Sequence, residues 1–293
     1  NTNSPLDSGF RRRTVACGRE LIRFARMSHL FIFGMGYSAS HLAAKLRAQG
    51  WQVRGTGRAG DVDFADSASV QAALAEATHI LSSVPPDRAT GLDPVLTHYA
   101  DILRASPARW IGYLSSTGVY GDAGGAWVDE TSVVGTGRRN ARTEADLVWQ
   151  ALDTRVRVLR LPGIYGPGRS ALDRVRDGSA KRIAMPGQVF SRVHVEDIAG
   201  GVIASFDGPA GVYNLADDLP CSQNRVIEAA CRLLGAPLPA LQSLEQANLS
   251  PMALGFYAEN RRVANGKAKR MLGWKLAYPD YEAGLAAILR GGG

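Results

Sequence analysis

The stretch HLFIFGMGYSASHLAAKLRAQGWQVRGTGR, His29 to Arg58, decides the fold of this chain. It opens with an apolar run over residues 30–33, which is too short for a stable helix and ends at a glycine, as a buried strand does. After a glycine turn, apolar residues recur at helical spacing over 39–46 until Gly50 ends the helix. Residues 51–55 predict a second strand. The unit is therefore strand, glycine turn, helix and strand.

The glycine turn has the sequence GMGYSA, which fits the pattern G-x-G-x-x-A. Gly34 can adopt backbone angles that a side chain forbids. Gly36 lets the backbone approach a pyrophosphate, and the small Ala39 lets the helix pack near the strand. The free N–H groups at the helix start, around Tyr37 and Ser38, then face the anion. Between a strand and a helix this pattern predicts a dinucleotide-binding site, the alternative being an ordinary turn without a ligand.

The end of the second strand bears on which dinucleotide is bound. An NAD-preferring site would place an acidic residue there to bind the ribose hydroxyls. This chain has no carboxylate before Asp61 and offers Thr56 and Arg58 instead. A hydroxyl and a guanidinium suit a 2′-phosphate, because arginine binds phosphate with paired hydrogen bonds. We therefore predict NADP as the cofactor, with NAD as the alternative if Arg58 is only a solvated loop charge.

Length, composition and charge limit the class of protein. A chain of 293 residues, 45% hydrophobic and 21% charged, is long enough for a large α/β domain with a smaller lobe. No apolar run is long enough to span a bilayer, so we expect no membrane partner. The net charge is +7, but six arginines fall within residues 1–27 and the rest of the chain has no basic block. We therefore expect no nucleic-acid partner.

The three cysteines and five histidines are scattered, which predicts neither a disulfide framework nor a metal site and favours a reducing, cytoplasmic location. Residues 1–27 differ from the rest, with an arginine-rich segment that ends at Met27. We expect a disordered extension there, with the functional protein starting near Met27. A start codon assigned too early and a targeting segment are the alternatives.

Downstream of the glycine turn, strands and helices alternate along the chain. The predicted strands span 78–84, 110–115 and 156–161, and the predicted helices span 67–77, 92–104 and 139–152. This alternation predicts an α/β fold with a Rossmann-type, doubly wound parallel sheet.

The character of the chain changes near Pro162, where glycine and proline cluster over 162–168 and predict a loop. Shorter elements follow: helices near 170–177, 197–206, 222–234, 261–272 and 279–290, and strands near 188–193 and 211–215. We predict an NAD(P)-binding domain over 28–165. Residues 166–293 form mainly a smaller C-terminal substrate lobe, with 188–216 returning to the core. Such a lobe would lie over the carboxyl ends of the strands, where ligands of open α/β sheets bind.

Residues 114–121, LSSTGVYG, lie at the carboxyl end of a predicted central strand. Three hydroxyls in a row, Ser115 to Thr117, could orient a substrate carbonyl or hydroxyl there. The alternative is a polar strand end that caps the next turn.

Four motifs in this order, GMGYSA, SSTGVYG, LRLPGIYGPGR and SRVHVEDIA, resemble the extended short-chain dehydrogenase/reductase family. This family contains NAD(P)-dependent epimerases, dehydratases and reductases that act on nucleotide sugars and similar substrates. The segment KAKRMLGW, residues 267–274, also resembles the usual ending of the family. The resemblance implies that Asp63 and Phe64 lie near the adenine, and that Ser116 takes the position of the catalytic Ser/Thr. It also implies that the glycine turn contacts the pyrophosphate.

The chain departs from this family at its Tyr-x-x-x-Lys pair, in which the Tyr is the general acid/base and the Lys holds the nicotinamide ribose. By the resemblance, Arg142 falls at the Lys position and Arg138 at the Tyr position. Arg142 could donate to ribose hydroxyls, whereas Arg138 cannot release a proton at neutral pH. The chain is thus similar to the atypical branch of the family, which keeps the fold and has lost the pair.

Other side chains are candidates for the missing acid. Tyr120 and Tyr165 lie on loops expected to face the cofactor, and a tyrosine near a cation can serve as an acid. His194 is a further candidate, although aromatic residues in such loops often only pack.

Two functions are compatible with this pattern. The first is an NAD(P)-dependent oxidoreductase or epimerase-like enzyme that acts by hydride transfer on a small polar substrate, for example one derived from a sugar. Ser116 would orient the substrate, Arg142 would fix the ribose, and Tyr165 or Tyr120 would supply the proton. The second is a non-catalytic NADP(H)-binding sensor or scaffold. A homodimer through helices 92–104 and 139–152 is compatible with either.

Overall fold

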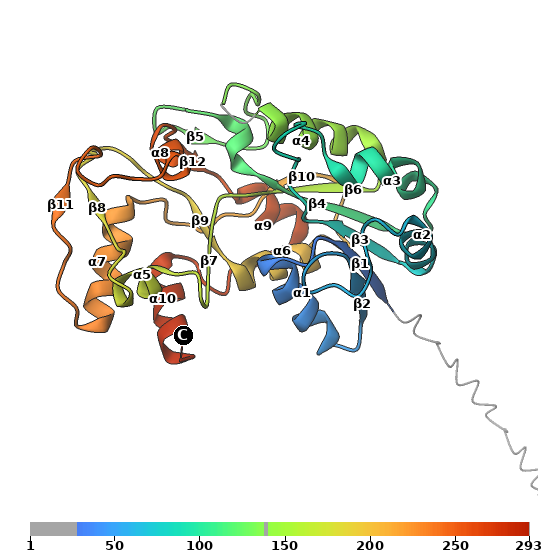
Figure 1. Cartoon of the computed structure of the whole chain (residues 1–293), viewed down its shortest axis with the longest axis horizontal. Helices are drawn as coiled ribbons and strands as arrows, with labels where there is room; N and C mark the ends of the chain where they lie inside the picture. The colour runs from blue at the N-terminus through green and yellow to red at the C-terminus, as the bar shows by residue number, and fades with distance from the viewer. Residues whose placement is uncertain (1–27, 138–139, 293) are drawn as a thin grey trace, which may run out of the picture.

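The computed structural model describes residues 28–137 and 140–292, and a six-stranded parallel sheet forms its centre (Figure 1). The strand order is β10-β6-β4-β3-β1-β2, and every neighbouring pair is parallel. The strands are β1 (His29–Phe33), β2 (Gln52–Gly55), β3 (His79–Ser82), β4 (Trp110–Ser116), β6 (Val156–Leu161) and β10 (Gly211–Asn214). The predicted doubly wound α/β fold is confirmed.

Helices cover both faces of this sheet, which explains why β1 is apolar on both sides. Leu30 and Ile32 pack in a cluster with α1 (Tyr37–Arg47), α6 (Val195–Ala204) and α9 (Gly266–Leu272). Phe31 and Phe33 point to the other face. They pack there with α2 (Ser67–Glu76), α3 (Pro94–Ala105) and α4 (Asn140–Leu152). Because strand side chains alternate between faces, one short apolar run serves two cores.

The strand order reverses beside β1. The chain passes from β1 to β2 on one side of it and then crosses to β3 on the other side. Ligands of doubly wound sheets bind outside the carboxyl ends of the strands at such a switch point. Gly34 follows β1 there, and Ser83 follows β3.

A second, smaller core lies beyond the carboxyl ends of the strands. It joins α5 (Ala171–Arg176), α7 (Gln223–Leu234) and α10 (Tyr281–Arg290) through their buried apolar faces. Figure 1 shows these helices grouped apart from the sheet, with β8 (Arg182–Ile183) and β11 (Leu241–Gln242) beside them. α8 (Pro251–Tyr257) lies farther up in this view, next to β12 (Arg262–Val263). The predicted C-terminal lobe is therefore present.

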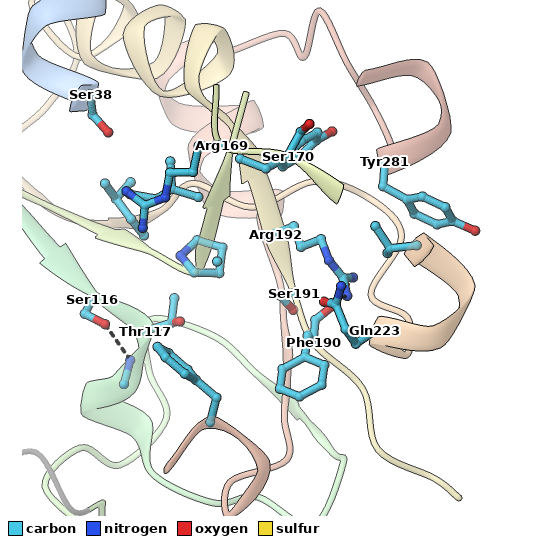
Figure 2. A pocket seen from close by; sticks show the side chains of 18 of the residues that line it. Ser38, Ser116, Thr117, Arg169, Ser170, Phe190, Ser191, Arg192, Gln223 and Tyr281 are labelled. Atoms are coloured by element: carbon cyan, nitrogen blue, oxygen red, sulfur yellow. Dashed lines mark hydrogen bonds between the residues drawn. The ribbon is translucent and has the colours of Figure 1, made fainter. Parts of the chain in front are cut away.

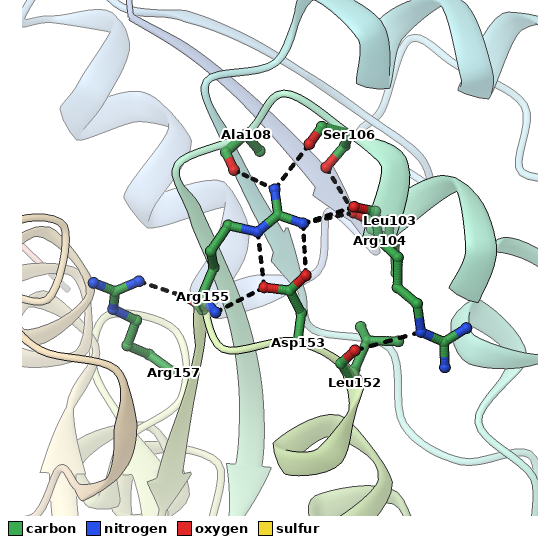
Figure 3. Close-up of polar contacts among 8 residues, drawn as sticks. All are labelled: Leu103, Arg104, Ser106, Ala108, Leu152, Asp153, Arg155 and Arg157. Atoms are coloured by element: carbon green, nitrogen blue, oxygen red, sulfur yellow. Dashed lines mark hydrogen bonds and ion pairs between the residues drawn. The ribbon is translucent and has the colours of Figure 1, made fainter.

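The opposite end of the sheet is held by Arg155, which precedes β6 (Figure 3). Its guanidinium pairs with both carboxylate oxygens of Asp153 at 2.8 Å. It also donates to the carbonyl oxygens of Arg104, Ser106 and Ala108 at 2.6–2.9 Å. One side chain thus satisfies carbonyls at and just beyond the end of α3, which the helix itself leaves unpaired.

The loop predicted over 162–168 is in part a strand. β7 (Gly163–Tyr165) pairs in parallel with β9 (Arg192–His194), so the prediction of a loop was wrong there. Glycines and prolines in this stretch are typical of a loop. The hydrogen bonds that make it a strand come from β9, far along the chain, so the local sequence does not indicate them. The strand expected near 188–193 is correspondingly shorter and shifted, and α6 begins already at Val195.

Two further differences concern the C-terminal part of the chain. The helix expected near 261–272 begins only at Gly266, because Arg262 and Val263 form β12, which pairs with β5 (Trp127–Val128). Helix α8 was not predicted. Within 188–216, β10 joins the main sheet and α6 packs on α1. The expectations for residues 1–27 and for Arg138 lie outside the described residues.

In the part of the chain that the structure describes, no helix combines the length and the apolar composition needed to cross a membrane.

Candidate functional site

The glycine turn is held in shape by the end of β2. Gly34 has a φ of +84°, and a Cβ there would lie 2.9 Å from Cγ2 of Val84, so only glycine fits. Its N–H donates to Oγ1 of Thr56 at 3.1 Å, and the N–H of Met35 donates to the Thr56 carbonyl at 2.7 Å. The buried Thr56 therefore positions the turn from within.

The start of α1 faces open space. Gly36 is the N-cap residue, and no side chain in the described part of the chain caps the helix. A Cβ on Gly36 would meet no atom within 4 Å. The first N–H groups of a helix have no partner inside it, and they carry partial positive charge. A pyrophosphate therefore fits the donors and the open space at this turn, where the sequence pattern predicts such a site.

A cavity of about 850 Å³ lies in front of this turn. It reaches from residues 36–39, past the end of β4 at residues 114–118, into the C-terminal lobe (Figure 2). Its size is that of a ligand site rather than a packing defect. The cavity thus joins the predicted cofactor turn, the hydroxyl-rich strand end and the predicted substrate lobe.

The residues predicted to contact the adenosine part lie outside this cavity. Arg58 is exposed, and no hydrogen bond or ion pair joins it to the described residues. Asp63 accepts the N–H of Ala65 at 3.0 Å, and Phe64 packs edge-on against Phe33 and Tyr99. Their roles toward a cofactor stay predictions.

Ser116 lies where β4 ends and a short 3₁₀ helix, η1 (Thr117–Tyr120), begins. Its Oγ accepts the N–H of Gly118 at 3.1 Å (Figure 2). The hydroxyl therefore does cap a turn, which was the alternative reading, but its proton remains available. Because Ser116 is half-buried and lines the cavity, it can still donate to a bound ligand.

Behind Ser116 lies a buried ion pair that sequence reasoning missed. Asp146 of α4 and Arg160 of β6 are 0% and 3% exposed. Nε and Nη2 of Arg160 donate to the two carboxylate oxygens at 3.0 and 2.7 Å, and Ser115 Oγ donates to Asp146 at 2.6 Å. The pair ties α4, β6 and β4 together directly behind the hydroxyl-rich strand end.

Tyr120 belongs to this buried network and not to the cavity wall. Its hydroxyl donates to Oδ1 of Asn214 at 2.8 Å and accepts from Nη1 of Arg160 at 3.0 Å. Burial raises its pKa despite the nearby guanidinium. The structure therefore does not bring Tyr120 together with the other predicted catalytic residues.

Arg142 and Tyr165 do line the cavity. Arg142, in the first turn of α4, points Nη1 toward the Tyr113 hydroxyl at 3.4 Å. The Tyr165 hydroxyl donates to the Asp280 carbonyl at 3.2 Å, and burial raises its pKa. Tyr165 therefore keeps its proton at neutral pH and donates it to a backbone carbonyl. The catalytic roles of Arg142 and Tyr165 stay predictions.

Arg169 is a cavity residue that the sequence analysis did not select. Its guanidinium carbon lies 5.7 Å from the centre of the Tyr37 ring, within the range of a cation–π contact. The Tyr37 hydroxyl donates to the Pro167 carbonyl at 3.0 Å. These contacts bring the segment after β7 against the glycine turn. The only signal was the motif YGPGR, which was interpreted as a loop.

Asp217, which follows β10, is an unusual buried acid. It is 2% exposed, and neither carboxylate oxygen makes a hydrogen bond with the described residues. Burial raises its pKa to about 7, although Arg192 opposes the shift. The backbone N–H of Leu219 also lowers the pKa of Asp217, although it lies outside the geometry of a hydrogen bond.

We expect Asp217 to make the protein less stable as pH rises. In the unfolded chain this carboxyl ionises near pH 4, about 3 units below its pKa in the fold. Between these values the folded protein keeps a proton that the unfolded chain has lost, so the free energy of unfolding falls with rising pH. The variant Asp217→Asn lacks this titration. As the pH rises from about 4 to about 8, the free energy of unfolding of the wild type, measured by urea denaturation, should fall by about 2–4 kcal/mol relative to that of the variant. A stability difference that does not change with pH would contradict this.

Comparison with known proteins gives relatives of this chain, although no protein-family model matches it. A structure of a functionally unknown conserved protein from Silicibacter pomeroyi DSS is 42% identical, covers 90% of this chain and 99% of its own, and has a TM-score of 0.80. A 3-diazoavenalumate denitrifying reductase from a Streptomyces species is 32% identical over 143 residues, 44% of this chain and 45% of the reductase. The human epimerase family protein SDR39U1, solved with NADPH, is 18% identical with a TM-score of 0.71. It covers 89% of this chain and 99% of its own.

Proposed function

We propose that this protein is an NAD(P)-dependent oxidoreductase. The chain belongs to one family with the Silicibacter pomeroyi protein. It has the fold of NAD-dependent epimerase/dehydratase-like extended short-chain dehydrogenase/reductase proteins. It would transfer hydride between the nicotinamide and a small polar substrate. The observation that carries the proposal is one continuous cavity, which joins the uncapped start of α1 to Ser116 and the lobe. Fold similarity alone would not support an activity.

The cofactor end of the cavity offers donors for a dinucleotide. The N–H groups of Tyr37, Ser38 and Ala39 would hold the pyrophosphate, and Arg169 adds a positive charge above the same turn. Arg142 would donate to the hydroxyls of the nicotinamide ribose. When bound, the nicotinamide supplies or accepts the hydride.

The substrate would lie beside Ser116, whose hydroxyl donates to a carbonyl or accepts from an alcohol. Of the two tyrosines proposed as acids, only Tyr165 lines the cavity. To protonate a product it would have to release the Asp280 carbonyl. We therefore propose Ser116 as the orienting donor and Tyr165 as the candidate acid.

NADP is the cofactor that we propose. Arg58 follows β2, where the 2′-phosphate of NADP would lie, and its exposed guanidinium is free to bind it. We expect Arg58→Ala to weaken NADPH binding about tenfold, which corresponds to one charge-assisted hydrogen bond of about 1.5 kcal/mol. NADH binding should stay unchanged, because NADH lacks the phosphate. Nicotinamide fluorescence measures both affinities, and equal effects on the two cofactors would contradict the proposed contact.

The proposed activity is tested by following NADPH oxidation at 340 nm with a panel of aldehydes, ketones and diazo compounds. Diazo compounds are included because the matched Streptomyces protein is named for a diazo substrate. We expect substrate-dependent loss of NADPH, together with transfer of deuterium from 4-deuterated NADPH to the product.

A non-catalytic NADP(H) sensor is the second candidate. It is favoured by one observation: burial raises the pKa of both candidate tyrosines, Tyr120 and Tyr165, and both hydroxyls already have partners. NADPH binding without turnover of any compound in the panel would support the sensor and contradict the enzyme.

A further inference from the structure

The lobe end of the cavity has its own set of polar and aromatic side chains. Arg174 comes from α5, Arg192 from β9 and Gln223 from the start of α7. Figure 2 shows Arg192 and Gln223 pointing toward one another, with Phe190 beside them. Phe190 packs edge-on against Tyr257 of α8, with the ring centres 5.3 Å apart. These residues form a wall away from the glycine turn.

The described lining of the cavity carries more positive than negative charge. It includes five arginines, at 142, 169, 174, 192 and 261, and three carboxylates, at 173, 177 and 259. Each carboxylate already has a partner: Asp173 accepts from Ser170, Asp177 from Ser179, and Glu259 pairs with Arg261 at 2.8 Å. Neither Arg174 nor Arg192 forms an ion pair with a described residue.

Arg192 is 6% exposed, and among the described residues only neutral groups accept its hydrogen bonds. Its donors reach the carbonyls of Phe190 and Cys221 at 2.9 and 3.2 Å, and Oε1 of Gln223 at 3.3 Å. Arg192 interacts electrostatically with the carboxyl of Asp217, whose pKa burial raises to about 7. Asp217 is therefore only partly ionised at neutral pH. A buried guanidinium without a full counter-charge favours an anion from outside.

Arg174 adds a second positive charge to this end. Arg174 is exposed, whereas Arg192 is buried. Desolvation and then the charge of Arg192 lower the pKa of Arg174, and the weaker effects of Tyr257, Asp177 and Asp173 oppose this shift. Both guanidiniums also act on Tyr257, lowering a phenol pKa that burial raises. Two like charges that line one cavity and act on one another repel, and a bound anion would relieve that repulsion.

The start of α7 also favours an anion at this end of the cavity. Ser222 caps the helix, Gln223 is its first residue, and no acidic residue stands in its first turn. The positive end of the helix dipole therefore lies beside Arg192. In addition, Nε2 of Gln223 is buried without a hydrogen-bond partner in the described structure, which leaves a donor to be satisfied.

We propose that the lobe end of the cavity binds an oxyanion of the substrate, a carboxylate or a phosphate, between Arg174 and Arg192 and next to Gln223. The apolar body of the substrate would lie against Phe190 and Tyr257, and its reacting group would extend toward Ser116. The inference rests on the proposed function for the direction of the substrate, while the oxyanion site itself stands on the side chains of the lobe.

Isothermal titration with three matched probes tests this site: 4-formylbenzoate, 4-formylphenyl phosphate and the neutral 4-formylbenzamide. Each is titrated into the protein alone and into the protein with NADP⁺. We expect at least one of the two anions to bind ten times more tightly than the amide, and the stronger anion identifies the group. Arg174→Gln should weaken that anion about tenfold and leave the amide unchanged.

Arg176→Gln is the matched control, because Arg176 lies on the same helix, carries the same charge and does not line the cavity. It should leave the affinity for the anion unchanged. Arg192→Lys keeps the buried charge but loses the forked donor, and we expect it to weaken the anion without changing the midpoint of thermal unfolding by more than a few degrees.

Equal binding of anion and amide, or equal losses in the two glutamine variants, would overturn the oxyanion site. Failure of both anions to bind would also overturn it, even if NADPH binds. Conversely, anion binding to a protein that binds neither NADPH nor NADH would support the site and contradict the proposed oxidoreductase function.

Discussion

Asp146→Ala should destabilise the protein by about 3–5 kcal/mol, because it leaves the charge of Arg160 buried and uncompensated. Arg160 is 3% exposed and makes a forked ion pair with this carboxylate. Its remaining partner, the Tyr120 hydroxyl, is neutral and cannot replace a carboxylate. The Ser115 hydroxyl would lose its acceptor as well. Urea denaturation followed by tryptophan fluorescence measures the loss.

Glu144→Ala is the control for this experiment. Glu144 lies on the same helix, two residues before Asp146, and is exposed, so its removal should change stability by less than about 0.5 kcal/mol. Equal stability of the two variants would contradict the buried ion pair.

Gly36→Val should abolish dinucleotide binding, raising the dissociation constant for NADPH about 100-fold or more. Its first side-chain atom would stand in the open space before the first turn of α1, where a pyrophosphate must approach. A hundredfold loss of affinity corresponds to about 2.7 kcal/mol of binding free energy. A displaced pyrophosphate would lose several hydrogen bonds, which together contribute more than this. Nicotinamide fluorescence gives the affinity.

The fold should tolerate this change. Gly36 has a φ of −91° and an extended backbone, which valine adopts readily. Apart from its two neighbours in the chain, no atom of the described residues lies within 4 Å of an added Cβ. We therefore expect an unchanged melting temperature. Gly200→Ala, a glycine substitution within α6 away from the cavity, should leave binding intact. NADPH affinity that survives in Gly36→Val would place the cofactor elsewhere.

Local sequence patterns were sufficient for the frame of the fold. The apolar run at 30–33, the glycine turn and the amphipathic residues before Gly50 predicted β1, α1 and β2 in place. Each of these signals lies within a few residues and has one physical cause, either alternating burial or a backbone angle that only glycine allows.

Long-range pairing was not predictable in the same way. β7 was interpreted as a loop because its glycine and proline neighbours break regular structure, while the hydrogen bonds that make it a strand come from β9. No helix was predicted between the helices at 222–234 and 261–272. α8 lies there, and it packs Tyr257 on Phe190 only in the folded chain.

The candidate site was predicted in part. Residues 36–39, Ser116, Arg142 and Tyr165 do line one cavity, as neighbouring strand ends of a parallel sheet should. Tyr120 does not, because its loop turns the ring into the buried network around Arg160. Arg192 gave no signal in sequence, since an arginine at the start of a short strand is expected to be solvated, and only the fold buries it.

Titration of the protein with NADPH and NADH, followed by nicotinamide fluorescence, tests most directly whether the cavity before α1 holds a nicotinamide dinucleotide. We expect saturable binding of one NADPH per chain, tighter than that of NADH and lost in Gly36→Val. If neither cofactor binds, or if both bind equally well to Gly36→Val, the cavity is not a dinucleotide site and the proposed function is wrong.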